Sequence, residues 1–432
     1  MMTFERKPTE AYVWIWLPGQ TKPVVAGRLS KSENRLLFNY GQSYLARENA
    51  IAIYDPELPL RRGVLPLTPG LTMPGCLRDA APDAWGRRVI MNHKFGRANR
   101  GIDAGDIDEL TYLLESGSDR IGALDFQQSA KTFVAREATA ASLNELQNAT
   151  ALVEQGIPLT PELEGALLHG SSIGGARPKS MIVAHDKKYI AKFSSHTDLY
   201  NIVKAEFIAM RLAEKVGITA AKVTLEQTAG KDVVLIERFD REKVSDGWHR
   251  RAMVSALTLL QLDEMMARYA SYEDLATMIR HRFTEPKNTL KQLYARLIFN
   301  ILCGNTDDHA RNHAAFWNGA ELSLTPASDI CPQQRTVGEV GQAMLIMGKE
   351  NASQLALCLK AAPLFLIDNE DAVKMITHQV TTIKNSWAEV CNEARLSEVD
   401  RNFMWRRQFL NPYAFVDAPK AIAELADFHV AQ

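Results

Sequence analysis

Residues 304–312 constrain the fold of this chain more than any other stretch, and they read Gly-Asn-Thr-Asp-Asp-His-Ala-Arg-Asn. Asp307 stands five residues before Asn312. The catalytic loop of protein kinases has the same spacing between the Asp that accepts the hydroxyl proton and the Asn that binds magnesium. The pattern therefore predicts a phosphoryl-transfer loop, with Asp307 as the base and Asn312 as a metal ligand.

The chain beyond this loop predicts a hairpin that leads back to it. Two β-like runs, 314–317 and 321–324, flank Asn318-Gly319, a pair suited to the positive φ angles of a two-residue turn. Such a hairpin would return Asp329 to Asn312, and kinases place a second metal-binding Asp at the corresponding point. Asp329 lacks the Phe-Gly that usually follows this Asp, so the chain is not an ordinary protein kinase.

Two other interpretations of the same loop stay open at this stage. His309 and His313 are four residues apart and would share one face of a helix, as two metal ligands do in some hydrolases. The stretch could also be a plain polar loop with a capping Asp. Short motifs match by accident, so the kinase interpretation needs a phosphate-binding loop and a lysine elsewhere in the chain.

Composition places the chain among soluble globular proteins with two or three domains, since its 432 residues are 46% hydrophobic and 23% charged. Fifty basic and 51 acidic residues nearly cancel, so no global field attracts nucleic acid. The five cysteines are scattered, which fits free thiols in a reducing compartment. No apolar run approaches the roughly 18 residues of a membrane span. We therefore expect a cytoplasmic protein with no membrane partner.

Short β-like runs separated by Pro, Gly and Asn dominate the beginning of the chain. They span residues 13–17, 24–29, 36–40 and 51–54. Helical patterns follow at 82–94, 107–115, 142–155 and from 160 onward, with a polar stretch at 127–141 between the second and the third. The first part of the chain thus predicts a small β-rich domain with helices.

A second stretch with chemical content spans residues 169–179 and reads His-Gly-Ser-Ser-Ile-Gly-Gly-Ala-Arg-Pro-Lys. Glycines such as Gly174 let a backbone approach phosphate oxygens closely, serines add hydroxyl donors, and Lys179 supplies positive charge. The stretch fits neither the Walker pattern nor the usual glycine-loop template of kinases. Alone it is a weak signal, because a Gly-Ser-rich turn is more often just a turn.

The pattern after this stretch matches the order of elements in a kinase N-lobe. Lys192 lies on the second of two predicted strands, 180–184 and 188–193, where kinase folds place the lysine that holds the α- and β-phosphates. A helix is predicted from Asp198, as its N-cap, to Gly217. On that helix Glu206 is set among apolar residues and would pair with Lys192.

A hinge and a helical part complete the kinase order. Strands predicted at 221–227 and 232–237 lead into residues 236–240, where backbone groups at a hinge can bind adenine. Helices are predicted at 272–283 and 287–303, the second ending at Gly304 before the catalytic loop. Further helices are predicted between 351 and 430.

The chain resembles the HipA family of bacterial toxin kinases along almost its whole length. The matching stretches are Ser172–Lys179, Tyr189–Phe193, Ile236–Asp240, Asn305–Asn312 and Leu324–Asp329, with Ala81–Trp85 and Gly117–Leu124 in the N-terminal part. The resemblance implies an α+β, bilobal, protein-kinase-like fold. Its domains would be a small β-rich N-terminal subdomain at 1–130, a kinase N-lobe at 131–240 and an all-helical C-terminal lobe at 241–432.

The resemblance also implies roles for individual residues. Asp307 would be the catalytic base, and Asn312 and Asp329 the Mg²⁺ ligands. The ATP contacts would come from Lys192, with Glu237 and Phe239 at the adenine hinge and with Gly174, Lys179 and Glu206 in support. Ser172 aligns with the serine that this family autophosphorylates, and the adjacent Ser171 could take the phosphate instead.

Partners follow from the same resemblance. Known members of the family phosphorylate aminoacyl-tRNA synthetases and so halt translation. Their antitoxin is a separate helix-turn-helix protein that joins the toxin to operator DNA, and the toxin can be dimeric in that complex. The sequence departs from the family pattern at Arg177-Pro178 and again after Asp240. The resemblance therefore does not extend to the substrate-facing residues of the segment after Asp240. A metal-dependent hydrolase and a catalytically silent binding scaffold remain the alternatives.

Overall fold

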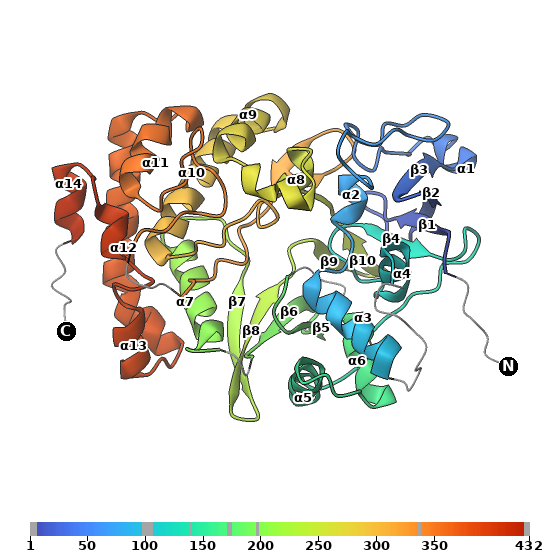
Figure 1. Cartoon of the computed structure of the whole chain (residues 1–432), viewed down its shortest axis with the longest axis horizontal. Coiled ribbons are helices and arrows are strands. Elements are labelled where there is room, and N and C mark those ends of the chain that lie inside the picture. The colour runs from blue at the N-terminus through green and yellow to red at the C-terminus, as the bar shows by residue number, and fades with distance from the viewer. Residues whose placement is uncertain are drawn as a thin grey trace. The chain divides into compact units, whose positions relative to one another are not determined.

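The computed structural model describes residues 7–96, 107–138, 140–170, 175–195, 198–334 and 338–426 (Figure 1). The chain divides into two compact units. The first comprises Met1–His196, Gln227–Val254 and Phe316–Ala320, and the second comprises Thr197–Glu226, Ser255–Ala315 and Glu321–Gln432. The domains expected from the sequence at 1–130, 131–240 and 241–432 stay predictions.

An antiparallel sheet forms the beginning of the first unit (Figure 1). Its strands are β1 (Glu10–Ile15), β2 (Val24–Ser32), β3 (Arg35–Tyr40) and β4 (Leu124–Gln127), in the order β3-β2-β1-β4. Leu29 lies opposite Phe38 and both are fully buried, whereas the next pair, Arg28 and Asn39, faces the other side. This alternation of apolar and polar positions is what makes these runs strands.

The strand predicted at 51–54 is wrong. Ala52, Ile53 and Tyr54 are buried, but they lie in an irregular segment that follows the short helix α1 (Gln42–Leu45). The Ile53 amide donates to the Tyr40 hydroxyl at 2.9 Å instead of joining a ladder. The apolar run therefore fills the core, and the fourth strand of the sheet is β4, which pairs with β1.

A second four-stranded sheet has the order β5-β6-β8-β7. Its strands are β5 (Lys179–Ala184), β6 (Lys187–Phe193), β8 (Lys231–Glu237) and β7 (Val223–Thr228). Both connecting turns have two successive residues at positive φ, His185 and Asp186 at 49° and 57°, and Ala229 and Gly230 at 48° and 75°. Positive φ at both central residues is the geometry of a type I′ hairpin turn. Because the turns form at these residues, the strands lie close to where the sequence predicted them.

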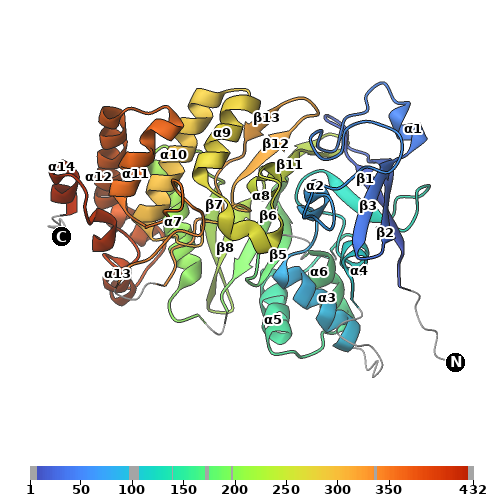
Figure 2. The same cartoon turned by 45° about the horizontal axis from the view of Figure 1, so that its top comes forward.

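Four helices pack with this sheet in the first unit. They are α3 (Ala84–Gly96), α4 (Glu109–Glu115), α5 (Leu143–Glu154) and α6 (Pro161–Gly170), and Figure 2 shows α3, α5 and α6 together beside β5. Ser142 and Glu145 form a capping box at the start of α5. One core joins Trp85, Val89 and Ile90 to Phe193 and Val233, so the helices after the first sheet and strands β6 and β8 share a single hydrophobic interior.

The second unit is mainly helical (Figure 1). Its helices are α7 (Ile202–Lys215), α8 (Ala256–Leu259), α9 (Tyr272–Arg282), α10 (Pro286–Cys303), α11 (Leu355–Ala361), α12 (Asn369–Glu393), α13 (Glu398–Met404) and α14 (Lys420–Ala423), with short 3₁₀ turns between some of them. Helix α10 is buried along most of its length and forms the centre of the unit. Helix α7 begins at an Asn201 N-cap rather than at the predicted Asp198, because the Asn201 side chain accepts the Lys204 amide.

Short strands interrupt the helices where the sequence patterns did not mark them. Strands β9 (Arg241–Val244), β10 (Gly247–Arg250) and β11 (Ala252–Ser255) follow β8. The predicted hairpin is present as β12 (Ala314–Trp317) and β13 (Leu322–Leu324). Its connection has four residues, of which Gly319 has a φ of 101°, so it is longer than the predicted two-residue turn.

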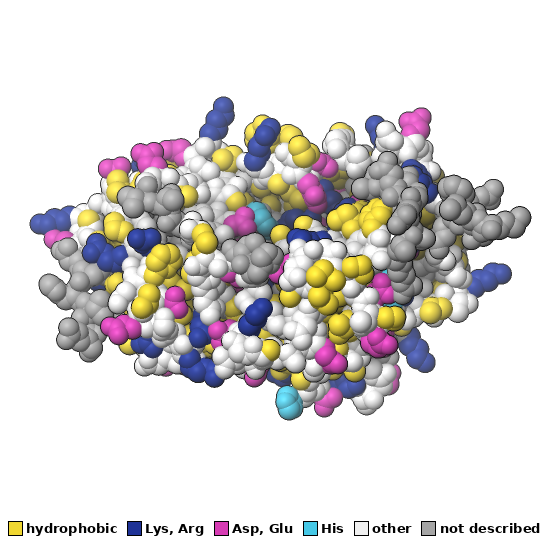
Figure 3. Space-filling model, turned by 60° about the horizontal axis from the view of Figure 1, so that its bottom comes forward, with side chains coloured by type: hydrophobic (Ala, Val, Ile, Leu, Met, Phe, Trp, Pro, Cys, Tyr) yellow, Lys and Arg dark blue, Asp and Glu magenta, His cyan; other side chains and the backbone are white. Residues whose placement is uncertain are grey.

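The surface agrees with the balanced charge of the sequence. Figure 3 shows basic and acidic side chains interspersed over the face that it presents. All five cysteines lie in the described part of the chain, buried and outside any disulfide. Within that part, none of the helices combines the length and the apolar character that crossing a bilayer requires.

Candidate active site

The loop after α10 starts with a residue that must be glycine. Gly304 has a φ of 71° and ends the helix in the left-handed conformation. A Cβ atom at this position would lie 2.6 Å from the carbonyl oxygen of Gln408. The chain therefore leaves α10 in one fixed direction, as the C′ glycine expected from the sequence requires.

Consecutive turns, not a helix, carry the loop from Asp307 to His313. The His309 amide donates to the Asp307 carbonyl at 2.9 Å, and the Asn312 amide donates to the His309 carbonyl at 2.9 Å. The Asn312 side-chain amide also donates to the Asp307 carbonyl at 3.3 Å. His309 and His313 do not share a helical face, so the spacing on which the hydrolase alternative rested has no helix to support it.

Asp308 and His313 of the loop face inward and form a buried polar cluster with Tyr272. The Nε2 atom of His313 lies 3.0 Å from Oδ1 of Asp308, and the Tyr272 hydroxyl donates to Oδ2 of the same carboxylate. Burial alone would raise the pKa of Asp308, but the His313 charge and the hydrogen bonds from both partners hold that pKa below its ordinary value. Asp308 therefore stays ionised. In the sequence, Asp308 directly follows Asp307 and His313 directly follows Asn312.

The hairpin returns Asp329 to the same region of the second unit. The Thr325 amide donates to the Ala314 carbonyl at 3.0 Å, and the Gln333 amide donates to the Gly304 carbonyl at 2.9 Å. Asp329 lies between these two attachments with a φ of 59°, a conformation that Asp tolerates better than most residues. The return that the sequence predicted is therefore fixed by backbone hydrogen bonds on both sides.

The electrostatics of Asp307 place its carboxylate near that of Asp329. Partial burial of the carboxyl group raises the pKa of Asp307, and the negative charges of Asp329 and Asp308 raise it further, while His309 acts in the opposite direction. Two carboxylates that raise each other's proton affinity in this way are close enough to interact. Asp307 thus interacts electrostatically with Asp329, and the Asn312 side chain contacts the Asp307 carbonyl; a shared metal site for the three residues stays a prediction.

This group of side chains fits a hard divalent cation. Carboxylate and amide oxygens are the ligands that Mg²⁺ takes, usually one or two carboxylates together with water and phosphate. A cation would also relieve the repulsion between Asp307 and Asp329. The described residues contain no cluster of three or more His, Cys, Asp or Glu side chains that could hold a metal.

The predicted phosphate-binding lysines lie on neighbouring strands of the first unit. Lys192 of β6 stands opposite Lys179 of β5 in the antiparallel register, so both side chains point to one face of the sheet. Both residues are buried, at 6% and 3% exposed. A Cβ atom at Gly175 would lie 2.1 Å from the Lys179 Nζ atom, which places this ammonium group directly under the described end of the Gly-rich stretch. Gly174, Ser171 and Ser172 lie outside the described residues.

The other two nucleotide elements expected from the sequence also have defined surroundings. Glu206 lies on α7 and is buried, and its pairing with Lys192 stays a prediction. Glu237 ends β8, where its carboxylate forms an ion pair with Lys187 at 2.7 Å. The ring of Phe239 packs edge to face against Phe316, with the ring centroids 5.9 Å apart. The hinge role of Glu237 and Phe239 likewise stays a prediction.

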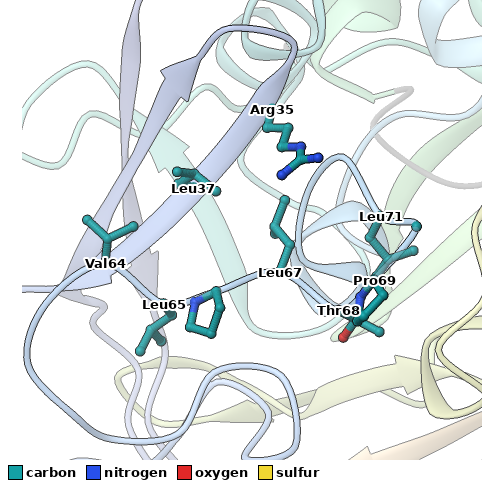
Figure 4. Close-up of a pocket in the computed structure, with 10 residues that line it drawn as sticks. Arg35, Leu37, Val64, Leu65, Leu67, Thr68, Pro69 and Leu71 are labelled. Atoms are coloured by element: carbon teal, nitrogen blue, oxygen red, sulfur yellow. The ribbon is translucent and has the colours of Figure 1, made fainter.

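A pocket of about 370 Å³ lies elsewhere in the first unit, beside strand β3 (Figure 4). It is lined by Arg35 and Leu37 of that strand and by the Pro-rich segment 64–71. None of the predicted site residues lines it.

Sequence reasoning missed the residues that support the site from within. Tyr272 stands far from the catalytic loop in sequence, and Asp119 contacts the segment after β8 from the N-terminal part of the chain. Both are common residue types in unremarkable local patterns. The only local signal was the run Gly117–Leu124, which belongs to the family resemblance but carried no assigned role.

Comparisons with known proteins give the family. The family descriptions "HipA N-terminal domain" and "HipA-like C-terminal domain" match residues 15–127 and 171–387. The chain is 26% identical over 216 residues to the putative kinase Y4mE of Sinorhizobium fredii. The aligned region covers 43% of this chain and 49% of that protein. It is 23% identical over 186 residues to the serine/threonine-protein kinase toxin HipA of Shewanella oneidensis, and this aligned region covers 37% of the chain and 42% of that protein. The chain thus spans about half the length of these relatives.

The fold has a match among solved structures. The structure of the Shewanella oneidensis HipA, HipB and operator DNA complex contains a chain with a TM-score of 0.66 and 16% identity, covering 96% of both chains. At this identity the likeness is one of fold, and it supports the α+β, kinase-like architecture that the motifs predicted. Because the two HipA descriptions together match most of the sequence, the chain belongs to the HipA family of kinase toxins.

Proposed function

We propose that the protein is an ATP- and Mg²⁺-dependent serine/threonine protein kinase. The proposal is supported by two observations in a chain of the HipA family: the Asn312 side chain contacts the Asp307 carbonyl, and the Asp329 charge acts on the Asp307 carboxyl. Phosphoryl transfer depends mainly on positioning and charge stabilisation, so a base beside two oxygen ligands is the minimal set that such a reaction needs.

The second unit would supply the proton acceptor. Asp307 would take the proton of the attacking hydroxyl, and its raised pKa makes it a better base than an ordinary Asp. Asn312 and Asp329 would hold Mg²⁺ through their side-chain oxygens. When bound, Mg²⁺ would neutralise the charge on the phosphate oxygens. The buried pairing of Asp308 with His313 would hold the loop so that Asp307 and Asn312 face outward.

The first unit would bind the nucleotide. Lys192 and Lys179 point two ammonium groups to one face of β5 and β6, which suits a polyphosphate. Gly174 would bring the backbone close to phosphate oxygens. Glu237 and Phe239 would contact adenine through the hinge, and Glu206 would orient Lys192. These six assignments rest on the family resemblance, and the burial of Lys192 and Lys179 agrees with it.

Ser172, or the adjacent Ser171, would be the site of autophosphorylation. A phosphoserine adds nearly two negative charges where the ATP phosphates would bind, so the modification would oppose nucleotide binding. This provides a simple way to shut off activity.

The biological role would be that of a toxin in a toxin–antitoxin pair. The substrate would be an aminoacyl-tRNA synthetase, whose phosphorylation inhibits translation in the cytoplasm. The partner would be a helix-turn-helix antitoxin that contacts DNA, and the complex would contain two toxin chains. The Shewanella HipA chain was solved together with HipB and operator DNA, which supports this choice of partner.

The decisive experiment measures transfer of radiolabel from ATP by the purified full-length chain. Wild type should label itself or a synthetase in the presence of Mg²⁺, and Asp307→Asn should abolish the transfer while the fold survives. Asp186→Asn is the matched control, because Asp186 lies exposed in a hairpin turn whose positive φ Asn accepts. Equal labelling by wild type and Asp307→Asn would remove Asp307 as the base.

Phosphosite mapping separates the remaining parts of the proposal. Phosphate on Ser171 or Ser172 in wild type, and on neither in Asp307→Asn, would support autophosphorylation at the Gly-rich stretch. Nucleotide binding without any transfer would instead favour the silent scaffold.

A further inference from the structure

The N-terminal family domain contacts a segment that overlaps the predicted adenine hinge. We name residues 117–122 the supporting turn and residues 238–241 the hinge segment; both belong to the first unit. Their hydrogen bonds run from Arg238 Nη2 to Arg120 O at 2.7 Å, from Arg241 Nη1 to Gly122 O at 2.8 Å, and from Gly122 N to Asp240 Oδ2 at 2.8 Å. Donors and acceptors are exchanged in both directions, so the two segments are fixed in one register.

Asp119 supplies the charge that this contact needs. Its Oδ1 atom accepts from Arg238 Nη1 at 3.1 Å and from Arg241 Nε at 2.9 Å, and its Oδ2 atom pairs with the Lys188 ammonium group. The Arg238 and Arg241 side chains are 1% and 0% exposed. Buried cations are tolerated only when paired. Burial alone would raise the pKa of Asp119, but these three cations hold it well below its ordinary value, so Asp119 stays ionised.

The same domain holds the described end of the Gly-rich stretch. The Gly175 amide donates to the Asp83 carboxylate at 2.5 Å. The Trp85 amide donates to the Gly175 carbonyl at 3.2 Å, and the Trp85 indole donates to the Lys179 carbonyl at 2.9 Å. These contacts are independent of the supporting turn and come from a different part of the domain. Two nucleotide elements are therefore attached to the N-terminal domain at two separate places.

The hydrophobic core agrees with this double attachment. Trp85, Val89 and Ile90 of α3 share one core with Ala191 and Phe193, which flank Lys192 on β6. The N-terminal domain thus packs directly against the strand that carries the predicted phosphate-binding lysine.

From these contacts we infer that the N-terminal domain helps to position the nucleotide-binding elements. Asp119 is the positioning residue for the hinge segment, and Asp83 is the positioning residue for the described end of the Gly-rich stretch, at Gly175. The inference rests on the proposed kinase function. It adds that Asp119 and Asp83, which lie outside the C-terminal family domain, affect the affinity for ATP. Neither residue is assigned a contact with the nucleotide; each acts through the backbone that it holds.

The test compares Asp119→Asn with Glu57→Gln in the same protein. Glu57 is a matched control because it is a buried carboxylate of the N-terminal domain that accepts from the Gly75 and Cys76 amides at 3.0 and 2.7 Å, away from the supporting turn and the hinge segment. Both variants lose a buried carboxylate, so both should lower the melting temperature. Only Asp119→Asn should displace the hinge segment, and it should weaken ATP binding by about tenfold or more, since small misplacements of binding groups are costly.

Binding is measured with ATP and Mg²⁺ at a temperature where all variants are folded, together with the KM for ATP and kcat. The expected result is a raised Kd and KM for Asp119→Asn, with values for Glu57→Gln close to wild type. Asp83→Asn provides a second arm, since Asp83 is only half-buried and its loss is milder for the fold; it should also raise the KM for ATP.

Each outcome decides between the two proposals. Equal affinities for Asp119→Asn, Asp83→Asn and Glu57→Gln would overturn the positioning role while leaving the kinase proposal intact. Failure of wild type itself to bind ATP would overturn both. If Asp119→Asn does not fold, an unchanged KM for Asp83→Asn overturns the inference and a raised KM supports it.

Discussion

The Nε2 atom of His313 lies 3.0 Å from Oδ1 of Asp308, and these two buried side chains belong to the residues that directly follow Asn312 and Asp307 in the chain. The Tyr272 hydroxyl donates to the other oxygen of Asp308 and lies 3.3 Å from the same imidazole nitrogen. The position of the proposed base therefore depends on buried neighbours that are not themselves proposed to contact substrate.

Tyr272→Phe should destabilise the protein and slow the reaction. The substitution leaves Asp308 buried with one hydrogen-bond donor fewer, which should cost about 1–3 kcal/mol in the free energy of unfolding. The loosened loop should lower kcat by roughly tenfold, with little change in the KM for ATP. Denaturant unfolding and steady-state kinetics measure the two effects. A variant with the wild-type kcat would show that the cluster does not position Asp307.

Asp307→Asn should make the ligand-free protein more stable at neutral pH. The fold raises the pKa of Asp307, so the ionised carboxyl is disfavoured in the native state relative to the unfolded chain. That penalty is present above the raised pKa and vanishes below about pH 4, where an ordinary Asp is itself protonated. Thermal melts in a chelator should therefore show a higher melting temperature for the variant at pH 7 and none of this advantage in acid. Asp186→Asn should show no such pH dependence.

Mg²⁺ and ATP together should stabilise wild type but not Asp329→Asn. Ligand present at about 100 times its Kd adds ~2.7 kcal/mol to the free energy of unfolding. Loss of one of the two proposed metal ligands should weaken the metal-dependent part of this gain. The measurement is the shift in melting temperature on adding MgATP, with and without a chelator. A full shift in Asp329→Asn would exclude that residue as a ligand.

Gly175→Ala should disturb Lys179. The new Cβ would lie 2.1 Å from the Lys179 Nζ atom, and the φ of 101° is itself strained for any residue with a side chain. We expect a loss of about 1–3 kcal/mol in stability from the strain and, in addition, weaker ATP binding. Gly19→Ala is the control, because Gly19 also has a positive φ, of 71°, but no atom lies within 4 Å of its added Cβ. Equal ATP affinity in the two variants would argue against a role for Lys179.

The parts of the site that could be predicted from the sequence are those fixed by local rules. The helix end at Gly304 and the hairpin before Asp329 depend on a few adjacent residues, and the structure has both of them. The roles predicted for Asp307, Asn312 and Asp329 from their spacing stay predictions. The strands around Lys192 were also predictable, because both of their turns have strong local preferences.

The remaining features depend on contacts between distant segments. Nothing near Tyr272 marks it as a partner of Asp308, and nothing near Asp119 marks it as a partner of Arg238. The false strand at 51–54 has the same cause, since an apolar run that fills a core looks like a run that joins a sheet. Asp198 was a plausible cap, but Asn201 lies in the position that reaches the Lys204 amide.

The hydrophobic core that α3 shares with β6 and β8 limits how the N-terminal part of the chain can be lost or separated during evolution. A chain that began after the first 130 residues would leave Ala191, Phe193 and Val233 facing water where Trp85, Val89 and Ile90 now cover them. Evolution could move the N-terminal part to a separate polypeptide only if that polypeptide still bound to the same strands. Loss of the segment without such a replacement would leave a protein prone to aggregation, because a large apolar surface would stay exposed.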